Sequence, residues 1–407
     1  MLTAAPHPLR TRRFRLLFTS RALALLGDAV TPVALALAVL QVTGSTSDLA
    51  LLLGCAMVPR LLLLPVGGVA GDRFDARTIG MATALVRAVA QVFVGVQLLG
   101  GAPELWQLAV AEACGGVATA FGQPAFSPLV IGTVTEPAAR QRANAAIGAA
   151  TSASRLAGPP LAGVLLLAEA GWAFVVVGVG YLVSAGLLAL VRVRHVAPKR
   201  RPFFADLRQG WAEVRSRDWY WTSLVAHSVW NGAAAVLATL GPAVALEELG
   251  GEGAWVALTT AGGAGLLVGS LVADRARPRN PVLTGNLGLT VYAAPLALLA
   301  VPAPLWVIVG AYGVAQAALG FLNPVWETAV QDAIPGPVLA RVVSYDWLLS
   351  LAAMPVGYVL GPLAAGAWGP GVPLVAAAVL VAVACAGTAA VPGVRDFGRR
   401  SVELAVK

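Results

Sequence analysis

Several ionisable side chains lie inside long apolar stretches of the chain, where they could bind protons or a charged ligand. Asp28 and Glu112 are carboxylates of this kind, and Arg87 and Arg155 are cations in other apolar stretches. A charge within a membrane helix costs about 2.5–3.5 kcal/mol on insertion scales, so such residues are functional candidates. We expect Asp28 and Glu112 to bind protons or a cationic ligand alternately, with Arg155 or Arg87 as counter-charge. The alternative is that all four form ion pairs that hold helices together.

The composition shows what must position these charges. Of the 407 residues, 58% are hydrophobic and 12% are charged, against roughly 25% charged in a soluble domain. Lipid must therefore cover most of the surface, and the fold class is an all-α membrane protein. Segments of about 20 apolar residues can cross a bilayer, and twelve are expected, at 15–41, 48–71, 78–100, 104–132, 142–168, 172–192, 219–247, 253–273, 280–301, 304–331, 340–367 and 372–392.

The placement of the basic residues predicts the orientation. With a cytoplasmic N-terminus, 24 of the 28 Lys and Arg residues fall in cytoplasmic tails and loops, whereas the opposite loops carry acids such as Asp48 and Glu104. This is the positive-inside pattern, and it favours a multi-pass plasma-membrane (cell inner membrane) protein with both termini cytoplasmic. It also argues against nucleic-acid binding despite the net charge of +8. The run after Arg10–Arg15 is too long for a signal peptide, so we expect an uncleaved first helix.

Two halves of the chain repeat at an offset of 200 to 203 residues. The pairs are Asp72-Arg73 with Asp274-Arg275, Pro124 with Pro324, and the Gly-Pro runs that begin at Gly158 and Gly361. The prediction is a pair of pseudo-symmetric six-helix bundles at 1–192 and 219–407, joined by a cytoplasmic linker at 193–218. Duplicated bundles are typical of secondary transporters, whose substrate site lies near the bilayer midplane.

The linker itself has an apolar face at helical spacing. Phe203, Leu207, Trp211 and Val214 share that face, which predicts an amphipathic helix on the inner membrane surface. The alternative is a plain basic linker.

One loop motif resembles that of a known family. The segment after the second apolar stretch reads Gly68-Val69-Ala70-Gly71-Asp72-Arg73-Phe74-Asp75-Ala76-Arg77. It resembles the Gly-x-Leu-Ala-Asp-Arg-x-Gly-Arg-Lys motif of the major facilitator superfamily, although Ala70, Asp75 and Ala76 depart from it. The resemblance covers essentially the whole chain and implies a gate formed by Gly68, Gly71, Asp72, Arg73 and Arg77, with Asp274, Arg275 and Arg341.

The fifth stretch carries a second motif of that family. Gly158-Pro159-Pro160-Leu161-Ala162-Gly163 is similar to the Gly-Pro-x-x-Gly-Gly element of its exporters, with departures at Pro160 and Ala162. Prolines remove backbone donors and bend a helix, and glycines such as Gly158 and Gly163 permit close packing. With these motifs the chain resembles bacterial multidrug-type efflux permeases, which implies proton antiport of a small molecule by a monomer.

Polar and aromatic residues at helical spacing are candidates for the substrate cavity. They are Phe121, Gln123, His227, Trp230, Asn231 and Trp347, although such stripes are also common in packing. The three cysteines and three histidines are too dispersed for a metal site. No Gly-x4-Gly-Lys phosphate loop occurs, because Lys199 follows Pro198 and Lys407 is the last residue. We therefore expect no cofactor, no metal and no enzymatic activity.

The expected function is proton-coupled export, by alternating access, of an amphipathic or cationic small molecule such as a drug. Two alternatives stay open. The first is proton-coupled uptake of a small nutrient, against which the fifth-stretch motif argues. The second is a membrane sensor or assembly protein that transports nothing, and for which the sequence offers no extramembrane domain.

Overall fold

The computed structural model describes residues 8–101, 103–134, 137–191, 203–275, 278–301, 303–334 and 336–397. Contacts between Cα atoms divide the chain into two compact units. The N-terminal unit comprises residues 1–44 and 51–200, and the C-terminal unit comprises residues 45–50 and 201–407. Every regular element among the described residues is helical.

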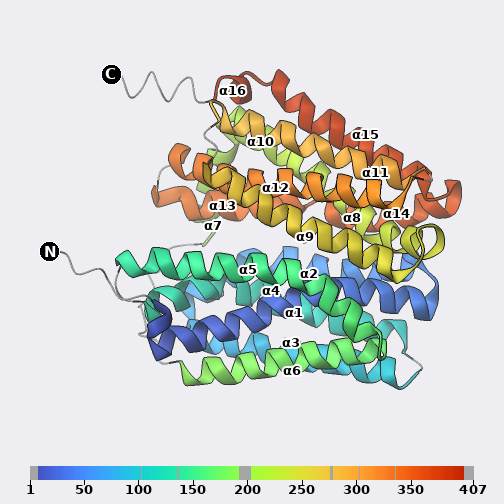
Figure 1. Cartoon of the computed structure of the whole chain (residues 1–407). Helices are drawn as coiled ribbons and strands as arrows, with labels where there is room; N and C mark the ends of the chain where they lie inside the picture. Colours follow the sequence, from blue (N-terminus) through green and yellow to red (C-terminus); the bar gives the residue numbers. More distant parts are fainter. Residues whose placement is uncertain are drawn as a thin grey trace. The chain divides into compact units, whose positions relative to one another are not determined.

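Six long helices form the N-terminal unit (Figure 1). They are α1 (Arg12–Thr43), α2 (Thr46–Arg73), α3 (Ala76–Leu99), α4 (Leu105–Thr133), α5 (Pro137–Leu166) and α6 (Ala170–Leu190), preceded by the short η1 (Pro8–Arg10). Side-chain caps explain two of the starts, since Thr11 accepts a hydrogen bond from the Phe14 amide and Asp75 accepts one from the Thr78 amide. Gly44, with φ of 61°, ends α1 in the left-handed conformation that glycine adopts without strain.

Small residues set how closely these helices approach one another. A Cβ at Gly116 of α4 would collide with the carbonyl of Ala56 on α2, and one at Gly67 of α2 would collide with the carbonyl of Ala120 on α4. Small residues allow this approach in membrane helix pairs. The apolar core around Phe14 packs α1, α3, α4, α5 and α6 together.

The C-terminal unit also consists of helices. They are α7 (Phe203–Arg215), α8 (Asp218–Glu248), α9 (Glu252–Arg275), α10 (Pro281–Leu289), η2 (Thr290–Tyr292), α11 (Ala293–Leu299), α12 (Leu305–Ala333), α13 (Gly336–Leu351), α14 (Met354–Trp368), α15 (Gly371–Gly387), η3 (Thr388–Ala390) and α16 (Pro392–Arg395). Two spans are therefore interrupted. The break between α13 and α14 precedes Pro355, and there the Ala353 amide donates to the Ser228 hydroxyl at 3.1 Å instead of continuing the helix.

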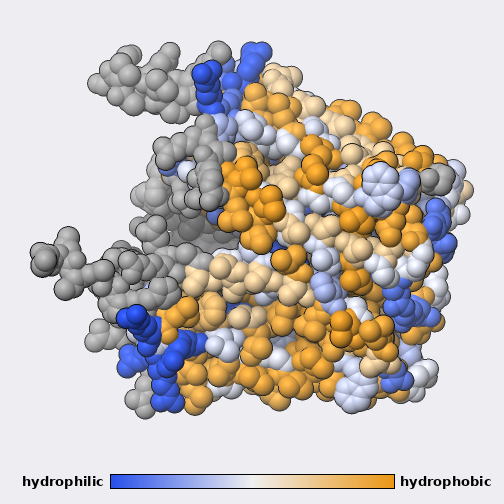
Figure 2. Space-filling model, viewed as in Figure 1, coloured by the Kyte–Doolittle hydropathy of each residue, from blue (hydrophilic) through white to orange (hydrophobic). Residues whose placement is uncertain are grey.

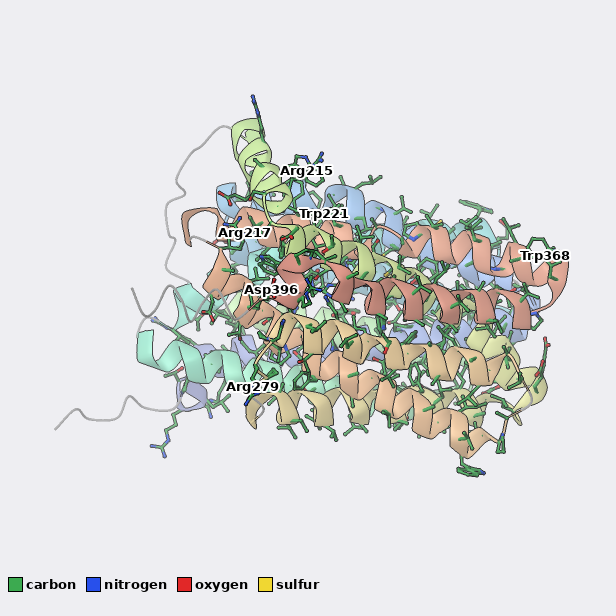
Figure 3. The ribbon with its side chains drawn as sticks, turned by 90° about the horizontal axis from the view of Figure 1, so that it is seen from above. Arg215, Arg217, Trp221, Arg279, Trp368 and Asp396 are labelled. Carbon is green, nitrogen blue, oxygen red and sulfur yellow. The ribbon has the colours of Figure 1, made fainter. Side chains whose placement is uncertain are left out.

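Helix α7 coincides with part of the expected linker helix. It lies crosswise to the long helices of its unit (Figure 3), and the Trp211 ring packs against Tyr345 of α13 at 5.6 Å between centroids. Val214 is buried and Trp211 is exposed, while the side chains of Phe203 and Leu207, like residues 193–202, lie outside the described part. Placement on the inner membrane surface stays a prediction.

Ten helical spans among the described residues are long and apolar enough to cross a membrane, with α10–α11 and α13–α14 each counting as one. Helices α4 and α5 are also long enough, at 29 and 30 residues. Every expected segment is helical within about five residues of its expected ends. Figure 2 shows apolar side chains over much of the visible surface and hydrophilic ones gathered towards helix ends. The arrangement in two six-helix bundles stays a prediction.

Candidate functional site

Asp28 lies in an ion pair that joins three helices of the N-terminal unit. The Arg87 guanidinium of α3 donates to the Asp28 carboxylate of α1 and also to the Tyr181 hydroxyl of α6. The Tyr181 hydroxyl itself donates to Asp28 Oδ1 at 2.9 Å, and the Arg87 guanidinium lies 4.1 Å from the centre of the Tyr181 ring. Tyr181 can come this close because Gly27 has no side chain, and a Cβ there would meet the tyrosine ring. Of the two arginines proposed as counter-charges, the structure pairs Arg87 with Asp28.

Glu112 of α4 is the second carboxylate of this unit and is buried. The Gln91 amide of α3 donates to Glu112 Oε1 at 3.5 Å, and the Thr31 hydroxyl of α1 donates to the Gln91 carbonyl oxygen at 3.4 Å. Arg87 and Gln91 are one turn apart on α3, so they lie on the same helical face. Helix α3 thus directs a cation to Asp28 and a neutral amide to Glu112.

The other arginines within the spans have different surroundings. Arg155 on α5 is exposed and takes part in neither ion pair found among the described residues. Arg60 of α2 donates to the Gln123 amide oxygen of α4 at 3.2 Å, and Arg21 lies over the Phe126 ring at 4.5 Å. Phe121, a cavity candidate, packs partly buried against the core around Phe14.

Of the side chains expected to form the gate, the structure describes that of Arg77. Arg77 donates to the carbonyl of Ala189 near the end of α6, and a cation at this end is favourable. Asp75, which departs from the family motif, caps α3. The side chains of Asp72, Arg73, Asp274, Arg275 and Arg341 lie outside the described part, and nothing in it tests Gly68 and Gly71, so the gating role of all these residues stays a prediction.

The α5 motif packs against the helix that carries Asp28. A Cβ at Gly158 would collide with Ala29, so glycine allows α5 to approach α1 one residue from the carboxylate. Pro159 is buried and Gly163 is half-buried.

The candidates on α8 lie largely in the interior of the C-terminal unit. His227 Nε2 is 3.0 Å from the Asn286 amide oxygen, and the Asn286 amide nitrogen donates to the Ser223 hydroxyl at 2.8 Å. The rings of Trp230 and Tyr292 pack at 4.5 Å between centroids. The half-buried Asn231 donates to a carbonyl of its own helix, while Trp347 on α13 is exposed. A role for these residues in substrate binding stays a prediction.

Sequence reasoning overlooked Asp346, an ionisable residue of this unit. Asp346 lies in the expected segment 340–367, between Tyr345 and Trp347, and accepts hydrogen bonds from Tyr220 and Trp326. The signal was present, because an aspartate within a membrane-spanning segment carries the same cost that singled out Asp28.

Comparison with known sequences gives one family over most of the chain. The Major Facilitator Superfamily pattern matches residues 17–346. An uncharacterised MFS-type transporter, YfiS of Bacillus subtilis (strain 168), is 26% identical over 373 residues, which is 84% of this chain and 85% of the relative.

Solved transporter structures share the fold at low sequence identity. A bacterial homologue of the human lysosomal transporter Spinster, in an inward-facing and unoccupied conformation, is similar with a TM-score of 0.72 at 16% identity, over 97% of this chain and 99% of that one. A POT family transporter in complex with 5-aminolevulinic acid gives 0.71 at 12% identity, over 92% and 94%. The nucleoside transporter NupG, as a variant, gives 0.69 at 11% identity, over 92% and 99%.

Proposed function

Because the chain belongs to the Major Facilitator Superfamily and is thus a transporter rather than an enzyme, we propose that it exports an amphipathic or cationic small molecule in exchange for protons. In this proposal, two six-helix halves rock around a central site in the plasma membrane, both termini are cytoplasmic, and the monomer is the active form. Alternating access of this kind is how duplicated transporters work.

The observation that carries the proposal is the polar network of the N-terminal unit. Asp28 and Glu112 both lie within helices that could cross the membrane, and each contacts α3, one through Arg87 and the other through Gln91. Charges in such helices mark ion and substrate pathways.

The two carboxylates differ in their partners, which divides their roles. Asp28 has a full counter-charge in Arg87, which stabilises its ionised form. Glu112 has a neutral amide as its hydrogen-bond donor. We assign the exchangeable proton to Glu112. At Asp28, a cationic substrate would compete with Arg87 for the carboxylate. A proton that leaves Glu112 towards the cytoplasm would then reset the carrier for the next substrate.

The energy of one proton is sufficient for useful export. A charge that crosses 100 mV releases roughly 2.3 kcal/mol. At about 1.4 kcal/mol per tenfold ratio, this supports a concentration gradient of about fiftyfold for a neutral substrate. One-for-one exchange with a monovalent cation moves no net charge, so the pH difference alone drives it, at about tenfold per pH unit.

We infer the direction of transport from family motifs rather than from the geometry. The Gly158-Pro159 run of α5 is similar to the exporter element, and α5 packs by Gly158 on α1 next to Asp28. This contact would allow movement of α5 to reach the Asp28–Arg87 pair.

The test uses purified protein in liposomes that contain the pH indicator pyranine and have an acidic interior. A panel of lipophilic cations, with ethidium and tetraphenylphosphonium as the first probes, is added outside. An exporter inserted with its cytoplasmic face outward takes up the cation and releases protons, so the interior pH rises.

Matched variants assign this signal to the site. We expect E112Q and D28N to abolish the proton signal and E104Q to keep it, because Glu104 is an exposed residue just before α4. A signal that E112Q and D28N both leave intact would refute the assignment. Uptake that needs an interior more alkaline than the exterior would show symport instead.

A further inference from the structure

The carboxylate of Asp346 in the C-terminal unit is held by hydrogen bonds from three neutral side chains. The Tyr220 hydroxyl of α8 and the Trp326 indole N–H of α12 both donate to Oδ2, at 2.8 and 2.7 Å. The Ser350 hydroxyl, one turn along α13, donates to Oδ1 at 3.4 Å. The carboxylate therefore connects α13 with two other helices of its unit.

The donors of this cluster are themselves buried and packed against one another. Tyr220 is 0% exposed and Trp326 is 7% exposed, and their rings are stacked at 5.4 Å with an interplanar angle of 5°. The His227 ring meets Trp326 edge-on at 4.8 Å. Asp346 thus lies in a candidate membrane-spanning segment, where it packs against aromatic rings rather than in a polar loop.

The charged and titratable groups that face Asp346 do not include a paired cation among the described side chains. On α8 they are Tyr220 and His227, and on α12 the nearest is Glu327. Arg217, just before α8, acts on Tyr220. Arg217 is committed to an ion pair with Glu213, and His227 Nε2 bonds to Asn286. Arg341 precedes Asp346 on α13, and its side chain lies outside the described part. Asp28, by contrast, has Arg87.

The hydrogen-bonding groups around Asp346 suit both of its protonation states. A hydroxyl can donate or accept, whereas an indole N–H can only donate. When a proton binds to Oδ2, the new O–H can donate to the Tyr220 oxygen, and the Tyr220 hydrogen can turn to the Val342 carbonyl, 3.5 Å away. Ser350 allows the same reversal at Oδ1. Trp326 continues to donate, so the carboxyl group remains in place as the proton arrives and leaves.

We propose that Asp346 is a second proton-binding carboxylate of this transporter, built into the C-terminal unit and distinct from Asp28 and Glu112. Tyr220 and Ser350 are positioning residues that reverse their hydrogen bonds, and Trp326 anchors the carboxylate. The inference rests on the proposed function only for the claim that protons drive transport. Binding of the proton itself is measured without a substrate.

The test is infrared difference spectroscopy of the full-length protein in lipid nanodiscs, recorded between alkaline and acidic buffer. A carboxyl group that takes up a proton gains a carbonyl stretching band, and ¹³C-aspartate labelling shifts the bands of aspartates but not those of glutamates. We expect an aspartate band that D346N removes. D332N is the matched control and keeps it, because Asp332 is an exposed aspartate near the end of α12 in the same unit. An unchanged band in D346N overturns the proposal.

Y220F provides a second readout that keeps the aromatic ring. It removes one donor from the ionised carboxylate, so the band should persist while its midpoint moves to higher pH. If D346N does not fold, the Y220F variant tests the proposal instead. An aspartate band whose titration midpoint and frequency are the same in Y220F as in the wild type overturns the proposal. D28N and E112Q, recorded in the same way, separate the two hypotheses. A band that is lost in D28N or E112Q bears on the proposed function, and a band that is lost in D346N bears on the proposal for Asp346.

Discussion

The Asp28–Arg87 pair couples two helices, and removal of one partner should be worse than removal of both. R87Q leaves the carboxylate with the Tyr181 hydroxyl as its remaining donor. The side chains of Arg87 and Asp28 are 19% and 38% exposed, so water offsets part of the loss. We expect R87Q to lower the free energy of unfolding by about 1–3 kcal/mol, as for a buried polar group that loses its partner.

The double variant D28N/R87Q is the control for this prediction. It carries no uncompensated charge, so its melting temperature in the same detergent should lie above that of R87Q. Equal melting temperatures for the two variants would show that the pair is not the reason for the loss.

The Tyr181 hydroxyl offers a finer change at the same site. Y181F keeps the ring that packs under Arg87 and removes the donor to Asp28 Oδ1. We expect a loss of about 1 kcal/mol, typical of one hydrogen bond, and a measurable fall in transport of the cation probe. Y312F is a useful comparison, because Tyr312 lies in the other unit, near Tyr292. A larger transport defect in Y312F than in Y181F would contradict a role for the Asp28 site.

At this scale the sequence identifies ionisable residues within the apolar segments but not how they pair. The cost of charge in an apolar helix identifies Asp28 and Glu112, yet leaves Arg87 and Arg155 as equal candidates for the counter-charge. The choice depends on helix rotation and on the space that Gly27 leaves for Tyr181, which are long-range properties. Asp346 carries the same signal as Asp28, but its pairing could not be predicted, because its partners are 126 and 20 residues away in the sequence.

At the scale of helices, glycines at close contacts should be more sensitive than glycines beside them. Gly116 of α4 faces the Ala56 carbonyl of α2, whereas a Cβ at Gly115 would meet nothing within 4 Å. We expect G116A to lower the melting temperature, because the two helices must separate. G115A should leave it unchanged or raise it, since alanine favours a helix by about 0.5–1 kcal/mol over glycine. The same ranking measured by cell-surface expression would support the contact, and the reverse ranking would contradict it.

Helix ends follow from local chemistry, and interruptions do not. Apolar segment length and caps such as Thr11 and Asp75 place the helices within a few residues. The break between α13 and α14 was not expected. A proline alone does not predict it, since Pro159 and Pro324 lie within continuous helices. At Ala353 the Ser228 hydroxyl of α8 takes over a backbone N–H, so the break depends on a partner 125 residues away.

At the scale of the whole molecule, the sequence repeat extends to how helices pack. Gly67 of α2 faces the Ala120 carbonyl of α4 in the N-terminal unit. Gly269 of α9, 202 residues after Gly67, faces the Ala317 carbonyl of α12 in the C-terminal unit. The offset of the two glycines equals that of the Asp72 and Asp274 motifs, while their partner alanines are 197 residues apart, so the two units share a similar helix contact as well as a loop sequence. This supports the proposal of duplicated halves.

The charge distribution predicts which helix ends face the cytoplasm. Figure 3 places Arg217, Arg279 and Asp396 towards one end of the C-terminal unit and Trp368 at the other. Under the positive-inside rule the arginine end is cytoplasmic. Single cysteines can test this in a background that replaces the native ones, Cys55, Cys114 and Cys385.

Four exposed positions divide into two pairs for this experiment. E104C and E169C should react with a membrane-impermeant maleimide in intact cells, because both lie at acidic helix ends that are predicted to face outward. S216C and R279C should react only after permeabilisation. Labelling of all four in intact cells would point to leaky cells, which an added cytosolic cysteine marker detects. If that marker is not labelled, labelling of S216C and R279C alone would show that the topology is the inverse of the predicted one.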